Sequence, residues 1–177
     1  MSKRLLELGV FTFSDAIEFV KNLPYGRTKH RANFYAVLEE LKGTCSTKHA
    51  VLRMLATEQG YTTVSLYMCI FKMNGHNTPI VNPILSKYHI DYIPEAHCVL
   101  KIDNKFVDVT SSKSNYDNLK ADVLCMEEIS PEQIGAFKVA YHKKYLKDWM
   151  VSQPYPYTFE TLWAVREECI RELSEHH

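Results

Sequence analysis

The chain has 177 residues, of which 46% are apolar and 24% are charged, a composition typical of a globular domain with a sizeable core. Its 21 basic and 21 acidic residues cancel, so no overall field favours nucleic acid or an anionic membrane as a partner. No apolar run reaches membrane-spanning length, and charge interrupts the first residues too soon for a signal peptide. The five cysteines are odd in number, widely spread and without a CxxC pair, so we expect a reducing, cytoplasmic setting.

These properties predict a single domain over residues 1–177. The last two residues, His176 and His177, are either native or the remnant of an affinity tag, and no inference rests on them.

The first predicted elements flank a basic loop. Thr12 or Ser14 is placed to cap a helix that ends before Pro24. The loop that follows carries one tyrosine and four basic side chains, which are Tyr25, Arg27, Lys29, His30 and Arg31. A second helix is predicted from apolar residues at helical spacing, which are Phe34, Val37, Leu38 and Leu41.

A glycine turn then opens into a helix that has a cysteine in its first turn. Gly43 allows a tight bend, Thr44 is a suitable N-cap, and Gly60 lies where a helix-ending glycine is expected. The amides and the positive end of the helix dipole beside Cys45 would stabilise a thiolate, which is the nucleophilic form. A buried structural cysteine is the other interpretation, so the assignment depends on partners.

The middle of the chain predicts a small antiparallel sheet. Residues 61–71 are rich in β-branched and aromatic types and indicate a central strand. A short helix is predicted from Asn82 to Tyr88. Residues 95–102 and 105–110 form two strands joined by the turn Asp103-Asn104, and residues 111–118 form a polar loop.

The C-terminal part predicts two helices over about residues 130–173. Ser130-Pro131-Glu132-Gln133 combines a capping box with proline at the first helical position. The apolar stripe of this helix, which ends at Pro154, consists of Ile134, Phe137, Tyr141, Tyr145 and Trp149. The last helix begins at about Thr158. Helices, then a sheet, then helices indicate an α+β fold.

The hairpin has a register that places two functional side chains on one face. With Asp103 and Asn104 in the turn, Leu100 pairs with Val107, and His97 and Asp108 become diagonal neighbours. A loop one residue longer or shorter would separate them. With Cys45, they form a candidate Cys-His-Asp triad, in which cysteine attacks an acyl carbon, histidine transfers the proton and aspartate orients the imidazole.

These residues resemble the transglutaminase-like cysteine superfamily. The similarity rests on the Gly-x-Cys helix start, the histidine strand and the Asp-x-Thr of the next strand, and it covers about residues 33–112. The resemblance implies a papain-like fold with Cys45 as nucleophile, His97 as base and Asp108 as orienting acid. The whole chain resembles a group of uncharacterised bacterial proteins through the segments 23–27, 42–46 and 92–97.

Several other residues allow different interpretations. His49 lies one helical turn after Cys45 and is a rival base. Glu95 is either a second acidic neighbour of His97, a substrate contact or, the interpretation we favour, an exposed strand-end residue. Arg27, Arg31 and Tyr25 are candidate substrate-binding residues, although a basic run is more often a solvated loop.

No cofactor is expected. The sequence has no HExxH motif, no CxxC pair and no glycine-rich phosphate loop, so we expect no metal ligands. For the oxyanion hole, the amide of Cys45 is the natural first donor, and Tyr25 and Asn33 are candidates for the second.

The sequence therefore predicts a cysteine-dependent amide hydrolase or acyltransferase that acts on a peptide, a protein or a small acyl substrate. A non-enzymatic binding module on the same fold is the alternative, with its cleft used for recognition or blocked by the C-terminal helices. A third possibility is an anion-binding protein that uses the basic loop.

Overall fold

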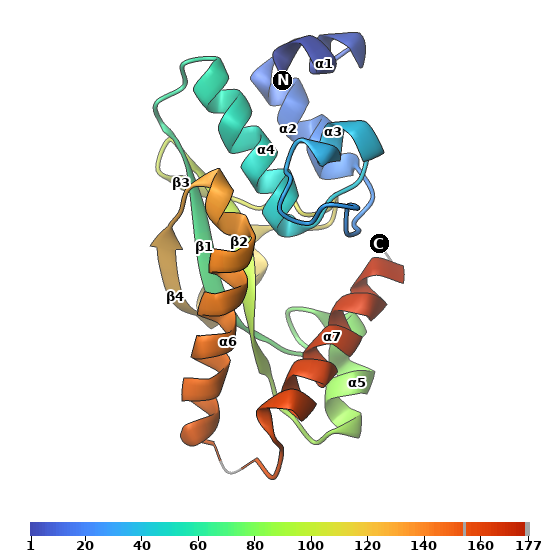
Figure 1. The fold of residues 1–177 in the computed structure, drawn as a ribbon, viewed down its shortest axis with the longest axis vertical. Helices are drawn as coiled ribbons and strands as arrows, with labels where there is room; N and C mark the ends of the chain where they lie inside the picture. The colour runs from blue at the N-terminus through green and yellow to red at the C-terminus, as the bar shows by residue number, and fades with distance from the viewer. Residues whose placement is uncertain (154, 176–177) are drawn as a thin grey trace.

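The computed structural model describes residues 1–153 and 155–175 and has the expected α+β class, with seven α-helices and a four-stranded antiparallel sheet in these ranges (Figure 1). The α-helices are α1 (Ser2–Glu7), α2 (Phe13–Asn22), α3 (Ala36–Glu40), α4 (Cys45–Glu58), α5 (Asn82–Lys87), α6 (Ala136–Val151) and α7 (Phe159–Glu175). The strands are β1 (Val64–Met73), β2 (Ile93–Ile102), β3 (Lys105–Val107) and β4 (Val123–Glu128). Four short 3₁₀ helices are η1 (Pro79–Val81), η2 (Tyr116–Asn118), η3 (Lys120–Asp122) and η4 (Pro131–Ile134).

The sheet has the strand order β3-β2-β1-β4, so β1 is central as predicted. The hairpin register is also confirmed, because Leu100 pairs with Val107 and Ile102 with Lys105. The ladder ends at Val107, so residues 108–110 leave β3 and approach α4 instead.

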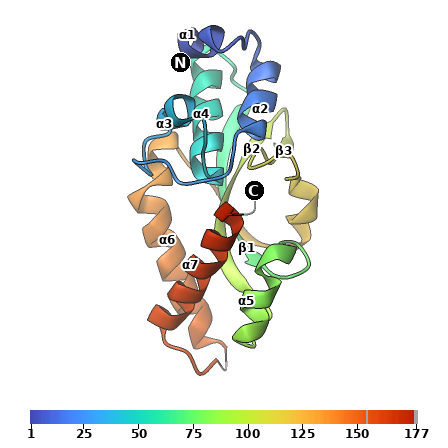
Figure 2. The same ribbon diagram turned by 90° about the vertical axis from the view of Figure 1, so that its right-hand side faces the viewer.

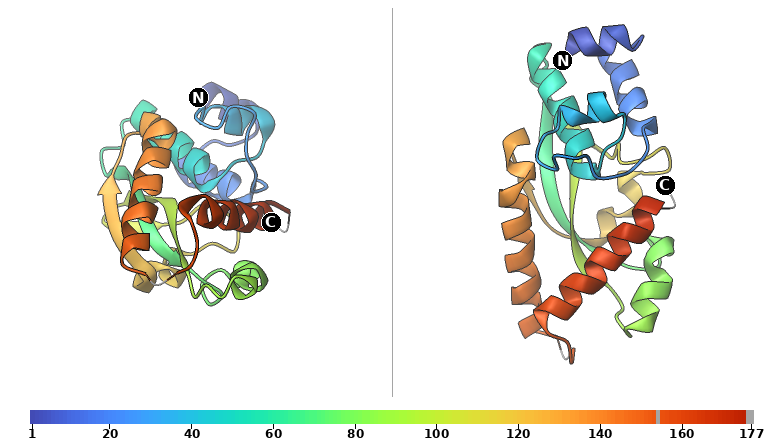
Figure 3. Two further views of the ribbon diagram at one scale, coloured as in Figure 1. Left: turned by 60° about the horizontal axis from the view of Figure 1, so that its bottom comes forward. Right: turned by 45° about the vertical axis from the view of Figure 1, so that its right-hand side comes forward.

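Two buried apolar cores lie at opposite ends of the long strands. Helices α1–α4 pack against the first half of β1 and the second half of β2, whereas α5, α7 and the second half of α6 pack against the other ends. Figures 1 and 2 show α1–α4 gathered at one end of the molecule and α5 and α7 at the other. Figure 3 shows α7 between α6 and α5, both of which it contacts. The boundary between the cores falls at residues 68–69 of β1 and 97–98 of β2, where Cys69 lies opposite His97.

The glycine turn fixes the start of α4 against the preceding chain. Gly43 donates its backbone N–H to Pro24 and accepts from Gly26, which joins it to Tyr25 in a parallel bridge. A Cβ on Gly43 would lie 2.9 Å from Thr47 Oγ1 and 3.0 Å from the side chain of Val37, so only glycine fits without displacement. This close packing brings Tyr25 beside the first turn of α4.

Three expectations from the sequence are wrong in detail. The helix predicted around Phe34 is only the short α3, and Leu41 is 41% exposed with φ of 50° instead of packing in the stripe. The helix expected from Ser130 is interrupted at Gly135, and the buried face of α6 consists of Lys138, His142, Leu146 and Trp149. Phe137, expected in the apolar stripe, is 42% exposed.

Among the α-helices and strands, α1 and the edge strand β4 were not predicted. Pro154, where the sequence predicts the end of a helix, and the terminal His176 and His177 lie outside the described residues.

Candidate active site

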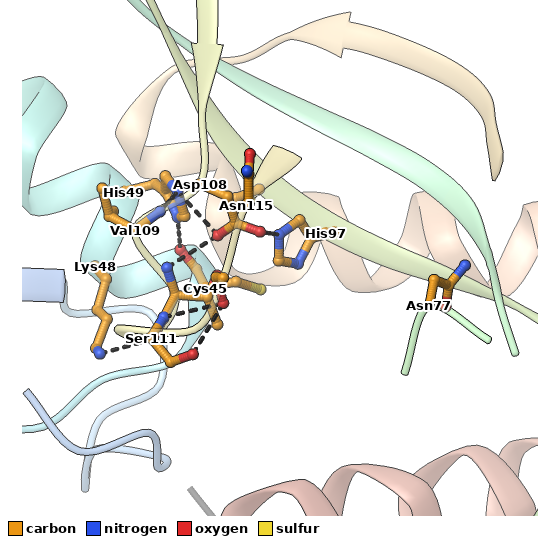
Figure 4. Close-up of polar contacts among 12 residues, drawn as sticks. Cys45, Lys48, His49, Asn77, His97, Asp108, Val109, Ser111 and Asn115 are labelled. Carbon is orange, nitrogen blue, oxygen red and sulfur yellow. Dashed lines mark hydrogen bonds and ion pairs between the residues drawn. The ribbon is translucent and has the colours of Figure 1, made fainter. Parts of the chain in front are cut away.

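The three residues of the predicted triad come together at the boundary between the two cores (Figure 4). Cys45 is the first residue of α4, His97 lies in β2, and Asp108 follows the end of β3. His97 Nε2 lies 2.9 Å from Asp108 Oδ2. Figure 4 shows the Cys45 sulfur near the His97 ring, and the two side chains are hydrogen-bonded. The imidazole therefore contacts both the sulfur and the carboxylate.

Asp108 is held in place by a backbone hydrogen bond and by the anchoring of the segment that follows it. The backbone N–H of Thr110 donates to Asp108 Oδ1 at 2.9 Å. The next part of this segment is tied to α4, because the buried Lys48 ammonium donates to the carbonyl of Thr110 at 2.7 Å and to that of Leu23. These bonds fix the carboxylate that orients His97.

The pKa shifts describe an ion pair between Cys45 and His97. Burial raises the pKa of the Cys45 thiol, but the charges of Lys138 and His97 and hydrogen bonds from His97 and the Cys98 backbone lower it to about 6. Burial lowers the pKa of His97, but Asp108 and Cys45 raise it well above its ordinary value. Both shifts favour the thiolate of Cys45 and the imidazolium of His97, and the thiolate is the nucleophilic form of cysteine.

Lys138 of α6 is a buried cation beside this pair that the sequence did not reveal. Its ammonium donates to Ser46 Oγ at 2.9 Å and to the carbonyl of Ala96 at 2.8 Å. Ser46 Oγ also accepts from the Cys98 thiol and lies 3.8 Å from Cys45 Sγ. Because Ser46 Oγ accepts from both Lys138 and Cys98, its own hydroxyl proton is available to the Cys45 sulfur.

His49, the rival base, has both ring nitrogens engaged in structural hydrogen bonds. The backbone N–H of Val109 donates to His49 Nε2 at 2.9 Å, so the proton resides on Nδ1, which donates to the carbonyl of Cys45 at 2.6 Å. Burial lowers the pKa of His49 to about 4. A neutral histidine with both nitrogens engaged links α4 to the Asp108 segment and is not placed to take a proton from substrate.

A cavity of about 380 Å³ opens beside Cys45, and all three predicted substrate-binding residues, Tyr25, Arg27 and Arg31, line it. Its other walls come from the start of α4, from β2 at Glu95, from the first half of α6 and from residues 163–170 of α7, including Lys138 and Trp163. The C-terminal helices thus form one side of the cavity. Asn33, a candidate for the second oxyanion donor, is not among the lining residues.

Glu95 is not the exposed residue expected at a strand end. It is 5% exposed and forms a two-pronged ion pair with Arg166 of α7, whose Nε lies 2.7 Å from Glu95 Oε2. Arg166 also contacts Glu167, which accepts from Arg27 at 2.8 Å. This network joins β2, α7 and the basic loop along the wall of the cavity.

Replacing Glu95 by glutamine is expected to destabilise the fold by about 3 kcal/mol, because it leaves the buried Arg166 guanidinium without its main carboxylate. Burial raises the pKa of Glu95, but Arg166 and His142 lower it overall to about 2 from an ordinary 4.5. The wild-type protein should therefore lose this stability as the pH falls from about 4.5 to about 2. Urea unfolding at pH 7 and across this range measures both effects.

The matched control for this prediction is Glu39→Gln, at an exposed position of α3, which should leave the urea midpoint unchanged. A Glu95→Gln midpoint equal to that of Glu39→Gln would show that the ion pair does not hold α7 in place.

No group of three or more His, Cys, Asp or Glu side chains in residues 1–153 and 155–175 is arranged to hold a metal ion. Within the same ranges, the helices include none with the length and apolarity needed to cross a membrane.

The comparisons with known proteins provide no relative. Profiles of known protein families gave no match to this chain, and neither did searches of curated proteins and of solved structures. The assignment of function therefore depends on the geometry of the site.

Proposed function

We propose that this chain is a transglutaminase-like cysteine hydrolase or acyltransferase that forms a thioester on Cys45. The observation that carries the proposal is the His97 imidazole held by Asp108 beside a sulfur of lowered pKa, at the edge of a cavity. The order of elements also supports a papain-like core, with the nucleophile at a helix start followed by antiparallel strands that carry the base and the acid. Five free cysteines, one of them a stabilised thiolate, suit a reducing compartment such as the cytoplasm.

In the proposed reaction, the Cys45 thiolate attacks the carbonyl carbon of an amide or ester and forms a C–S bond. The imidazolium of His97 gives its proton to the leaving amine as the C–N bond breaks. Water or a second amine then attacks the thioester, His97 takes up its proton, and Cys45 leaves as the thiolate. The backbone N–H of Cys45, at the positive end of α4, is the proposed first donor to the oxyanion.

The proposal predicts a burst of p-nitrophenolate, about one per chain, when the protein is mixed with p-nitrophenyl acetate, because acylation of Cys45 precedes its hydrolysis. Mass spectrometry should find the acetyl group on Cys45. Cys45→Ser should abolish the burst, whereas Cys69→Ser should retain it, because burial raises the pKa of that thiol to about 12.

The outcomes separate the candidate classes. No burst, together with uniform slow alkylation of the five cysteines, would contradict the enzyme and favour a binding module. An added primary amine distinguishes the two enzymatic routes, since faster turnover with an amide product indicates transfer and unchanged turnover indicates hydrolysis.

A further inference from the structure

The cavity beside Cys45 has an excess of positive charge. Five cationic side chains and two carboxylates line it, and the cations are Arg27, Arg31, Lys138, Lys143 and Arg166. Such a concave site raises the local concentration of anions.

Three of the five cations are already engaged by the protein. Arg27 pairs with Glu167, Arg166 pairs with Glu95, and Lys138 is buried against Ser46. Both cavity carboxylates are thereby neutralised, which leaves the two remaining cations without a carboxylate in the cavity.

The remaining cations are Arg31 of the basic loop and Lys143 of α6. Both line the cavity, both are exposed, and neither forms an ion pair within the described residues. They reach the cavity from two different elements, with the Cys45 sulfur in the same cavity. An anion bound in the cavity could therefore interact with two cations that no carboxylate of the described residues neutralises.

Trp163 of α7 supplies an apolar surface next to this pair of cations. The Lys143 ammonium lies 5.0 Å from the centre of the Trp163 ring, and the Arg166 guanidinium lies 5.3 Å from it. These contacts hold the ring in the cavity wall, where it can contact the carbon chain of a substrate whose anionic group reaches Lys143.

We infer that the acyl substrate of this site carries an anionic group, a carboxylate or a phosphate, that is bound by Arg31 and Lys143. This inference rests on the proposed function, because it describes the substrate of the Cys45 nucleophile.

Two alkylating agents of nearly equal size test the inference. In both, the thiolate attacks the methylene carbon, a C–S bond forms and iodide leaves, but iodoacetate is anionic and iodoacetamide is neutral. An ordinary thiolate reacts faster with iodoacetamide, because the carboxylate of iodoacetate repels it. Cys45 is expected to show the reverse preference. Arg31→Ala combined with Lys143→Ala should slow its alkylation by iodoacetate about tenfold and its alkylation by iodoacetamide less than twofold.

The chain offers charge-matched controls on the same two elements. Lys29→Ala in the basic loop and Lys144→Ala on α6 each remove one exposed cation that does not line the cavity, so the preference for iodoacetate should survive in both. Acetate and inorganic phosphate, added as competitors, identify the anionic group by which of them protects Cys45 more strongly. If neither acetate nor phosphate protects Cys45 from alkylation, the cavity does not bind anions and the inference is wrong.

The failure of this inference is distinguishable from the failure of the proposed function. If iodoacetamide labels Cys45 selectively but iodoacetate reacts no faster than iodoacetamide, Cys45 remains the proposed nucleophile and the inference of an anionic substrate is wrong. If neither reagent selects Cys45 over the other cysteines, the proposed function itself fails.

Discussion

Replacing His97 by alanine is expected to slow the acylation of Cys45 by p-nitrophenyl acetate about 10²- to 10⁴-fold at pH 7, the range that a positioned acid-base group contributes. Two losses combine in this variant. The thiolate loses the imidazolium charge and hydrogen bond that help to lower its pKa, and the leaving group loses its proton donor. The measurement is the burst rate constant in stopped flow.

The control is His76→Ala, which removes an exposed histidine from the loop after β1 and should leave the burst unchanged. Added imidazole should restore part of the rate of His97→Ala, since it can occupy the space that the ring leaves beside Asp108. A His97→Ala variant that is folded and retains the wild-type burst would exclude His97 as the base.

The part of the site that depends on local pairing could be predicted from the sequence. The two-residue turn correctly predicts the register of the hairpin as far as Val107. The predicted contact between His97 and Asp108 is present at 2.9 Å, although Asp108 lies just beyond the end of β3 and not in the paired strand. The start of α4 was predictable for a similar reason, because Gly43 and Thr44 mark a helix start within three residues of Cys45. Their catalytic roles remain predictions.

The contribution of α6 could not be predicted from its apolar residues. The stripe through Phe137 and Tyr141 assumed one continuous helix from Ser130, but the chain forms a 3₁₀ turn and changes direction at Gly135. The face that is buried then contains a lysine and a histidine, Lys138 and His142, which a hydrophobic pattern assigns to solvent. Each is buried because it donates to a backbone carbonyl of β2, at Ala96 and Pro94 respectively.

The burial of Glu95 could not be predicted from the sequence either, because it depends on a residue that is distant in the chain. Its partner Arg166 is 71 residues away in the sequence, and a charged residue at a strand end is normally exposed. Only the packing of α7 against the end of β2 makes burial of both charges possible. The sequence showed only an acidic residue two positions before His97, on the same side of the strand. That pattern does not identify the cation with which Glu95 pairs.

Replacing Lys138 by methionine is expected to raise the pKa of Cys45 by about one pH unit or more, because a buried charge near a thiolate acts through a low dielectric. Among the influences that lower this pKa, the Lys138 charge is the largest. In the wild-type protein, the alkylation of Cys45 by iodoacetamide should rise with pH through an inflection at about 6, well below the 9.0 of an ordinary thiol. In Lys138→Met the inflection should move to higher pH, so labelling at pH 6 should fall about fivefold for a shift of one pH unit, while the high-pH plateau changes little.

Two further variants separate the charge of Lys138 from its hydrogen bonds. Lys138→Gln can still donate to Ser46 or Ala96 without carrying a charge, so its inflection should follow that of the methionine variant. Lys144→Met removes an exposed charge from the same helix, where it pairs with Asp148 at 2.6 Å, and its inflection should remain at about 6. If Lys138→Gln instead retains the wild-type inflection, the hydrogen bond through Ser46 Oγ stabilises the thiolate and the charge does not. An unshifted inflection in both Lys138 variants would show that His97 and the start of α4 alone set the reactivity of Cys45.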